Sequence, residues 1–289
     1  MQSLPPFPER PFHPYERVPY TGRKFGQAFH ILCRGCGYGS IGQLMCRIFK
    51  DDNIDETLYP FIVGVGCYSG LPLILPGRSL MTPHGRTLAV ATGIKLANPK
   101  STPICFAGDG DNLAIGTNHF MQACRRNIGI VLIMLHNNIY GMTGGQVAPT
   151  TPMGMRASTA TYGYLEPEFD PVALALTAGA TYVARWTTGH PRQFMKSVRK
   201  AMQWKGFSFI DMISQCPTYF GRNNDMGEPV DVFNWIKGNS IPLEKTKGMS
   251  EEDLKGKFVI GEFRESPQKE LSEKYIELIQ TLRSRSKGK

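Results

Sequence analysis

The clearest structural pattern in the sequence is ICFAGDGDNLAIGTNHFMQACRRNIGIVLIMLHNNIYGMTGGQ, residues 104–146. A short apolar run, residues 104–107, breaks into the turn Gly108-Asp109-Gly110-Asp111. A helix is predicted over residues 112–127, and a second apolar run, residues 128–135, ends at His136-Asn137-Asn138. This order of strand, glycine turn, helix, strand and polar turn is typical of one βαβ unit with parallel strands.

Asp109 and Asn137 each follow one of these strands. Because the carboxyl ends of parallel strands share one edge of a sheet, where such folds bind ligands, we expect the two side chains to meet. Carboxylate and amide oxygens suit Mg²⁺, which binds a few protein oxygens together with phosphate and water. The glycine turn and the N-terminus of the following helix favour a diphosphate at the same place.

The rest of the chain repeats this alternation of strands and helices. Strands are predicted at residues 60–65, 181–185 and 207–213, and helices at 41–50, 88–97 and 190–204. We therefore predict an α/β fold with one doubly wound, mostly parallel sheet. Three parts are expected: a proline- and aromatic-rich arm (1–24), the main domain (25–217), and a C-terminal extension (218–289) packed on the domain or on a partner.

Composition narrows the class of protein. The 289 residues are 41% hydrophobic and 20% charged, which is typical of a globular chain, and no apolar run approaches the ~18 residues of a membrane span. The N-terminus lacks a secretory signal pattern, so a cytoplasmic location and no membrane association are expected. The net charge of +9 suits anionic cofactors, and no nucleic-acid-binding signature accompanies it.

Four of the seven cysteines are predicted to face the edge that carries Asp109. Cys33 and Cys36 form a C-x₂-C pair in a glycine-rich turn, while Cys67 and Cys216 each follow an apolar strand. Seven cysteines in a cytoplasmic chain favour metal binding or catalysis over disulfides. Iron–sulfur clusters and zinc both accept four thiolates, and the spacing does not separate them. The remaining cysteines are predicted to be buried hydrophobic residues: Cys46, Cys105 and Cys124.

With these residues assembled, the chain resembles the β subunit of 2-oxoacid:ferredoxin oxidoreductases, from about Cys33 to Cys216. The run Cys33-Arg-Gly-Cys36-Gly is similar to the family's CxGCG motif, and Asp109 and Asn137 fall in its thiamine diphosphate motif, GDG followed by NN. The resemblance implies the thiamine diphosphate-binding fold. It also implies that Cys33, Cys36, Cys67 and Cys216 bind one [4Fe–4S] cluster close to that cofactor.

The resemblance also implies roles for single residues. Mg²⁺ would be held by Asp109, Asn137 and the carbonyl of Ile139; Asn137 is preferred over Asn138 because the family's ligand stands three residues before a Tyr-Gly. His84 would contact the cofactor and act catalytically, by orienting substrate or transferring a proton. The other expected cofactor contacts are Val65, Gly66, Cys67, Tyr68, Gly110, Asp111, Gly141 and Met142.

The implied activity is the thiamine diphosphate-dependent oxidative decarboxylation of a 2-oxoacid to an acyl-CoA, with electrons passed through the cluster to ferredoxin. The motifs YGMTGGQ (residues 140–146) and APTTP (residues 148–152) most resemble those of 2-oxoglutarate-type β subunits. They favour 2-oxoglutarate as the substrate, with pyruvate and branched-chain 2-oxoacids as alternatives. Gly144 stands where several relatives have a lysine. Thiamine enzymes need a carboxylate from a separate domain, so an obligate α subunit is expected, in an αβ or α2β2 assembly.

Two other interpretations remain open at this point. In the first, the chain is a non-redox thiamine diphosphate decarboxylase or synthase subunit whose cysteines are structural. In the second, it is a zinc- or cluster-binding interaction protein, although such a protein has no use for the pair Asp109 and Asn137.

Overall fold

A computed structural model describes residues 32–287, so the predicted arm at residues 1–24 lies outside the described residues. The strands of this part are β1 Phe61–Val63, β2 Ser79–Met81, β3 Ile104–Gly108, β4 Val131–His136, β5 Ile139–Tyr140, β6 Gln146–Val147, β7 Tyr182–Thr187, β8 Ser208–Ile213, β9 Ser240–Pro242 and β10 Phe258–Glu265. Its α-helices are α1 Gly37–Asp51, α2 Thr87–Ala97, α3 Thr117–Arg126, α4 Pro171–Ala178, α5 Pro191–Gln203, α6 Pro229–Gly238, α7 Glu251–Leu254 and α8 Leu271–Lys287.

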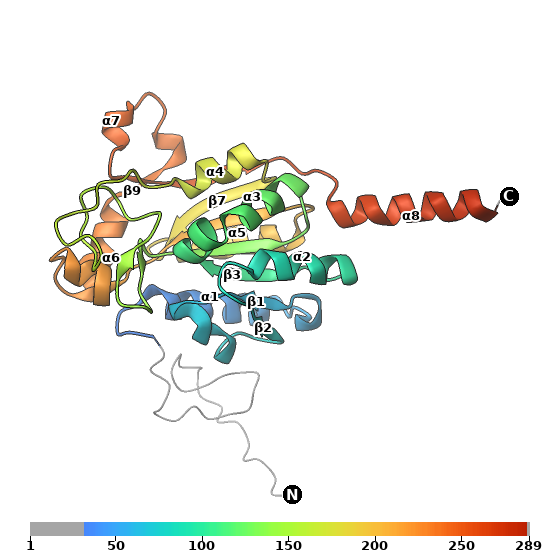
Figure 1. Cartoon of the computed structure of the whole chain (residues 1–289), viewed down its shortest axis with the longest axis horizontal. Coiled ribbons are helices and arrows are strands. Elements are labelled where there is room, and N and C mark those ends of the chain that lie inside the picture. Colours follow the sequence, from blue (N-terminus) through green and yellow to red (C-terminus); the bar gives the residue numbers. More distant parts are fainter. Residues whose placement is uncertain (1–31, 288–289) are drawn as a thin grey trace, which may run out of the picture.

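One sheet of eight strands organises the described chain, in the order β2-β1-β3-β4-β8-β7-β10-β9. Neighbouring strands are parallel throughout, except that β10 runs antiparallel to β7. Helices α2, α3 and α4 cover one face of the sheet, and α1 and α5 cover the other (Figure 1). The predicted doubly wound, mostly parallel α/β fold is confirmed.

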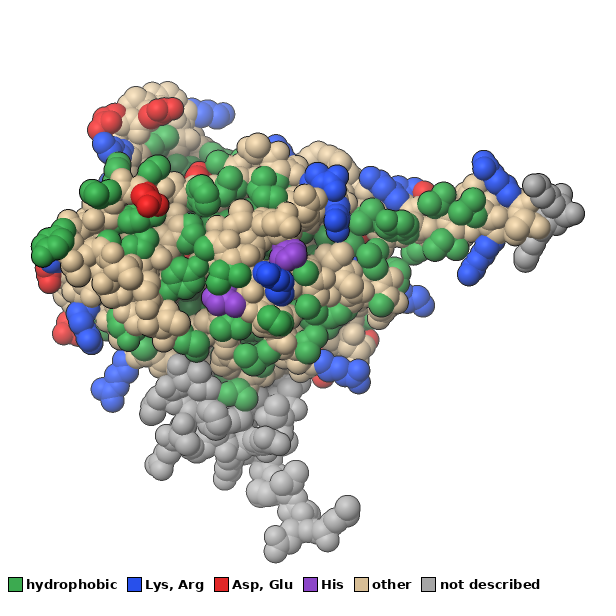
Figure 2. Space-filling view, viewed as in Figure 1, with side chains coloured by type: hydrophobic (Ala, Val, Ile, Leu, Met, Phe, Trp, Pro, Cys, Tyr) green, Lys and Arg blue, Asp and Glu red, His purple; other side chains and the backbone are tan. Residues whose placement is uncertain are grey.

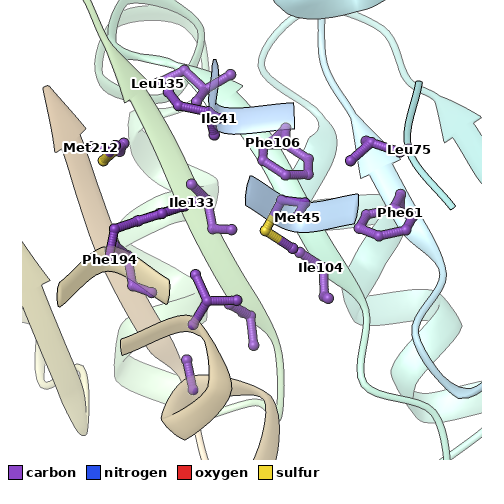
Figure 3. Close-up of a cluster of buried hydrophobic side chains, with 14 of the residues drawn as sticks. Ile41, Met45, Phe61, Leu75, Ile104, Phe106, Ile133, Leu135, Phe194 and Met212 are labelled. Atoms are coloured by element: carbon purple, nitrogen blue, oxygen red, sulfur yellow. The ribbon is translucent and has the colours of Figure 1, made fainter. Parts of the chain in front are cut away.

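The core explains why the central strands are continuous apolar runs. Every residue of β3 and β4 is buried, as expected for parallel strands that are covered on both faces. On one face, Phe106 and Ile133 of the sheet pack with Met45 of α1 and Phe194 of α5 (Figure 3). Burial of such side chains supplies the main driving force for folding, at about 25 cal/mol per Å² of apolar area.

The predicted helix over residues 112–127 is broken in the structure. It begins as a turn of π-helix, Asp111–Ile115, and continues as α3 only after Gly116. The amide of Gly116 donates to the carbonyl of Asp111 at 2.9 Å, which widens the first turn. A Cβ on Gly116 would lie 2.7 Å from that carbonyl, so a side chain has no room there.

The C-terminal region extends the same sheet rather than forming a separate body. Strands β9 and β10 lie beyond β7, and α8 projects away from the sheet with apolar and basic side chains along it (Figures 1 and 2). The start of α8 is fixed by Glu270, a buried carboxylate that accepts from the amide of Gly129 at 2.9 Å and pairs with Lys95 at 3.5 Å. No described helix is long and apolar enough to cross a membrane.

Candidate active site

A groove opens at the carboxyl ends of β1, β3 and β4, where the connecting turns meet. It has a volume of about 440 Å³, counting the part that is open to solvent. The groove brings together the predicted cofactor contacts and both predicted side-chain Mg²⁺ ligands. Its lining residues are Tyr38, Val65, Gly66, Cys67, Tyr68, His84, Gly108, Asp109, Gly110, Asp111, Asn137, Ile139, Tyr140, Gly141, Met142 and Thr143.

The carboxylate of Asp109 is buried and held by several donors. Its Oδ2 atom accepts from the hydroxyl of Thr150 at 2.6 Å and from the amides of Asn138 and Asn137 at 2.7 and 3.3 Å. Within residues 32–287, the one donor to its Oδ1 atom is the amide of Gly110, at 2.9 Å, so this oxygen keeps a lone pair free. Burial raises the pKa of Asp109, and this effect exceeds the opposing effect of the His136 charge and of the hydrogen bonds, which lower the pKa. A bound cation would favour the ionised form.

The two asparagines after β4 have different surroundings. Asn137 lines the groove, and its Oδ1 atom accepts from the amide of Ile139 at 3.3 Å. Asn138 does not line the groove; it has a left-handed backbone, φ 63°, and its Oδ1 atom lies 2.7 Å from Nε2 of His136. Asn137 therefore lies at the groove surface, whereas Asn138 shapes the turn.

Asp111, the second carboxylate of the GDGD turn, is fully engaged by protein groups. Its Oδ2 atom accepts from the hydroxyl of Tyr68 at 2.6 Å, and its Oδ1 atom contacts Nδ1 of His84 and the amide of Gly85. These contacts hold the ring of His84, which lines the groove. The side chain of Asp111 thus orients His84, its neighbour in the groove lining.

Backbone contacts bring the C-x₂-C turn to the same edge. The amide of Cys36 donates to the carbonyl of Cys33 at 3.1 Å, and the amide of Gly37 donates to the carbonyl of Gln215 at 3.3 Å. The turn thereby lies beside Cys216. Gly35 has φ +75°, and a Cβ there would lie 2.3 Å from Pro229, so this turn requires glycine.

The thiols of Cys67 and Cys216 lie on either side of Gly141, a glycine that lines the groove. A Cβ built on Gly141 would lie 3.0 Å from Sγ of Cys67 and 3.9 Å from Sγ of Cys216. At Gly141, only backbone atoms separate the groove from these two sulfur atoms. A group bound by these thiols would lie next to a ligand in the groove.

Burial raises the pKa of Cys36 and Cys67, two of the predicted cluster cysteines. It raises the pKa of Cys36 to about 12, and charges on Cys216, Cys67 and Cys33 add to the rise. Burial likewise raises the pKa of Cys67 to about 11, with Cys216 and Cys33 again contributing. The hydrogen bond between Gly37 and Gln215, and the position of Gly141 between Cys67 and Cys216, bring the chain at the four predicted cysteines to one edge of the sheet. The other three cysteines, Cys46, Cys105 and Cys124, are buried, and none of the seven forms a disulfide.

Sequence reasoning missed several residues of this site. Thr150 bonds Asp109, the hydroxyl of Tyr140 donates to the carbonyl of Gly110 at 2.9 Å, and Tyr38 lines the groove. It also missed Asp211, which lies next to His136. One signal was present: Asp211 is a charged residue inside the apolar run of β8.

The fold and groove place the chain in a known class of cofactor-binding domain. Residues 64–212 match the family described as "Thiamine pyrophosphate enzyme, C-terminal TPP binding domain", and the chain belongs to that family. This match spans the Asp109 turn, His84 and Asn137.

Individual relatives narrow the family further. The chain is 50% identical over 255 residues to 2-oxoglutarate synthase subunit KorB of Methanocaldococcus jannaschii, covering 88% of this chain and 94% of that one. It is 40% identical over 254 residues to the KorB subunit of Archaeoglobus fulgidus, covering 88% and 90%. A solved structure, 2-oxoglutarate:ferredoxin oxidoreductase from Magnetococcus marinus with 2-oxoglutarate, coenzyme A and succinyl-CoA bound, matches with a TM-score of 0.79 and 29% identity, covering 89% and 88%.

Within the thiamine enzymes, the chain therefore belongs to the KorB-type β subunits of 2-oxoacid:ferredoxin oxidoreductases. The family resemblance and the oxidoreductase class predicted from the sequence are confirmed.

Proposed function

We propose that this chain is the cofactor-binding β subunit of an enzyme that converts 2-oxoglutarate and coenzyme A into succinyl-CoA and CO2 and passes the electrons to ferredoxin. The observation that carries the proposal is that Cys67 and Cys216 flank Gly141 of the groove that contains Asp109 and Asn137, with the Cys33–Cys36 turn bonded beside Cys216. The names of the KorB relatives and the ligands of the Magnetococcus marinus structure support 2-oxoglutarate as the substrate.

Mg²⁺ fits the oxygen atoms of the Asp109 turn. Asp109 keeps a free lone pair on Oδ1, Asn137 offers an amide oxygen, and Ile139 offers its carbonyl at the groove. These are hard oxygen donors, few enough for Mg²⁺ to keep phosphate and water ligands. No three His, Cys, Asp or Glu side chains between residues 32 and 287 form a ready-made metal site, and a site with one carboxylate does not require them.

Thiamine diphosphate fits the rest of the groove, with contacts at Val65, Gly66, Cys67, Tyr68, His84, Gly110, Asp111, Gly141 and Met142. A Cβ on Gly66 would lie 2.5 Å from the ring of Tyr68, so the chain there presents only backbone. When bound, the cofactor supplies an electron-accepting ring for cleaving the bond beside the 2-oxo group. Asp111 contributes by holding the ring of His84 rather than by binding phosphate, since its oxygens are already occupied.

The proposed ligands of a [4Fe–4S] cluster are Cys33, Cys36, Cys67 and Cys216. No three of these side chains form a ready-made metal site between residues 32 and 287, so binding a cluster would require the thiols to move toward one another. A cubane cluster takes one thiolate at each of its irons, and binding would replace the protons that these buried thiols otherwise retain. Cys33 is exposed whereas Cys216 is buried, so the cluster would extend from the groove toward the surface. That direction suits electron transfer to ferredoxin.

A partner subunit would complete the site. The only carboxylates among the groove-lining residues are Asp109 and Asp111, and both are engaged by hydrogen bonds. The carboxylate that activates thiamine would therefore come from an α subunit, in an αβ or α2β2 assembly. Large apolar side chains in and after the groove are exposed and suit such a contact: Met142, Met153, Tyr162, Leu165 and Phe169.

The test is a substrate panel on the α–β complex, purified anaerobically and analysed for iron, sulfide and thiamine diphosphate. We expect iron and sulfide in cluster proportion and CoA-dependent reduction of a viologen dye, fastest with 2-oxoglutarate. A preference for pyruvate or a branched-chain 2-oxoacid would change the substrate. Activity without iron would favour the non-redox decarboxylase, and no binding of thiamine diphosphate in the presence of Mg²⁺ would favour an interaction protein.

The unpaired cysteines support a reducing, cytoplasmic location.

A further inference from the structure

A buried chain of charged groups reaches the Asp109 turn from the centre of the sheet. Asp211 of β8 is completely buried, and its register partner in β7 is Arg185. Nε of Arg185 donates to Oδ2 of Asp211 at 2.6 Å, and Oδ1 of Asp211 lies 2.9 Å from Nδ1 of His136. None of the three residues lines the groove.

Stability alone does not account for this arrangement. Moving charged groups out of water costs several kcal/mol for each ion, and well-packed apolar residues in their place are often neutral or stabilising. Both oxygens of Asp211 and both ring nitrogens of His136 have hydrogen-bond partners, so the buried polar atoms of the network are satisfied.

One end of the network holds the proposed cation site. Nε2 of His136 lies 2.7 Å from Oδ1 of Asn138, and the amide of Asn138 donates to Oδ2 of Asp109 at 2.7 Å. Asn138 has φ 63°, a left-handed conformation that needs support from its surroundings. The contact with His136 supplies such support, and Asn137 precedes it in the same turn.

The other end holds the loop that returns from this turn. The guanidinium of Arg185 contacts Asp170, whose Oδ1 atom also accepts from the amide of Val172 at 2.9 Å and so caps α4. Residues 139–169 lie between the two anchored ends. This loop carries Thr150, the hydroxyl donor to Asp109.

We propose that Asp211 is a positioning residue of the cation site: through His136 and Asn138 it fixes the turn that carries Asp109 and Asn137, and through Arg185 it fixes the loop that carries Thr150. This role rests on the proposed function, in which that turn binds Mg²⁺. Groups that orient metal ligands from behind commonly change metal affinity by about 10- to 100-fold when they are removed.

The test is a Mg²⁺ titration of thiamine diphosphate binding to the α–β complex carrying Asp211→Asn. We expect the apparent Kd for Mg²⁺ to rise about tenfold. Saturating Mg²⁺ should restore cofactor binding and bring kcat to within about twofold of the wild-type value, because the ligands themselves are intact. A purely structural defect would not be corrected by the cation.

The matched control is Glu270→Gln, which removes another buried carboxylate, one that bonds Gly129 near the opposite edge of the sheet. It should lower Tm and leave the Mg²⁺ titration unchanged. If Asp211→Asn also changes only Tm, the positioning role is wrong. Should Asp211→Asn not fold, Arg185→Lys decides by the same titration: a raised Kd supports the role and an unchanged Kd overturns it.

The wild-type complex separates this inference from the proposed function. Thiamine diphosphate binding that needs no divalent cation would overturn the Mg²⁺ assignment, and the positioning role with it. Mg²⁺-dependent binding in the wild type with an unchanged Kd in both variants would overturn the positioning role alone.

Discussion

Asp109 and the four cysteines occupy the same edge of the sheet, but their surroundings differ. The carboxylate of Asp109 accepts hydrogen bonds from Thr150, Asn138, Asn137 and Gly110, so its position is fixed without a cation. Cys36 and Cys67 lie in surroundings that raise their pKa to about 12 and about 11, so without a cluster they are neutral thiols. The proposed Mg²⁺ site is thus preorganised by the protein, whereas the proposed cluster site needs its metal to acquire charge.

The two sites should therefore respond differently to mutation. The Mg²⁺ affinity of a preorganised oxygen site depends on the hydrogen bonds that hold its ligands. Substituting one of the residues that donate these bonds should therefore lower the affinity only partly. A thiolate site depends on the ligands themselves, so its loss should be complete. Four experiments sharpen or break this distinction.

The largest effect is expected from Cys67→Ala in the α–β complex. Removing one of four thiolates should abolish the cluster absorbance near ~400 nm and the reduction of viologen dye. Anaerobic spectroscopy and iron analysis measure this. The control Cys124→Ala removes a thiol that is buried on α3, and it should keep both signals. Full cluster content in Cys67→Ala would break the comparison.

The next effect is expected at the asparagine pair. Asn137→Ala removes a proposed ligand and should weaken Mg²⁺-dependent binding of thiamine diphosphate by about 100-fold or more, at the upper end of the range for metal-site partners. Asn138→Gly keeps the left-handed backbone and loses only the contact with His136, so it should cost about tenfold or less. Calorimetry at several Mg²⁺ concentrations measures both, and the reverse order would contradict the assignment.

A smaller effect concerns the thiols and pH. In cluster-free protein, alkylation of Cys36 and Cys67 should become about tenfold faster for each pH unit between pH 8 and 10, because the thiolate is the nucleophile and pH stays below the raised pKa of each thiol. Mass spectrometry after timed exposure to iodoacetamide measures the rates. A plateau below pH 9 would mean that the thiolates are already stable without metal.

The smallest effect is expected from Thr150→Val, which removes one donor to Asp109 and keeps the shape of the side chain. The Kd for Mg²⁺ should rise about threefold to tenfold, since a single hydrogen bond contributes on the order of 1 kcal/mol. The control is Thr92→Val, which removes a hydroxyl that donates to a carbonyl within α2. Equal titration curves for the two variants would show that Asp109 does not depend on its donors.

The amino-acid sequence was enough to predict the parallel strands, the turns that end them and the cysteines beside those turns. These features follow from local patterns: apolar runs predict buried strands, glycines predict tight turns, and parallel strands place their carboxyl ends at one edge. The sequence also predicted the cofactor class, because the residues around Asp109 and Asn137 carry it within a single βαβ unit.

The hydrogen bonds that support these residues became visible in the folded chain. The contacts of Asp111 with His84, of Thr150 with Asp109, and of Asp211 with Arg185 and His136 join positions that are distant in the chain. No periodic pattern encodes such contacts, since they depend on the register of neighbouring strands and on loops that return to the sheet. The antiparallel pairing of β10 with β7 was hidden for the same reason. Local patterns thus identify where ligands lie, and long-range packing decides how firmly they are held.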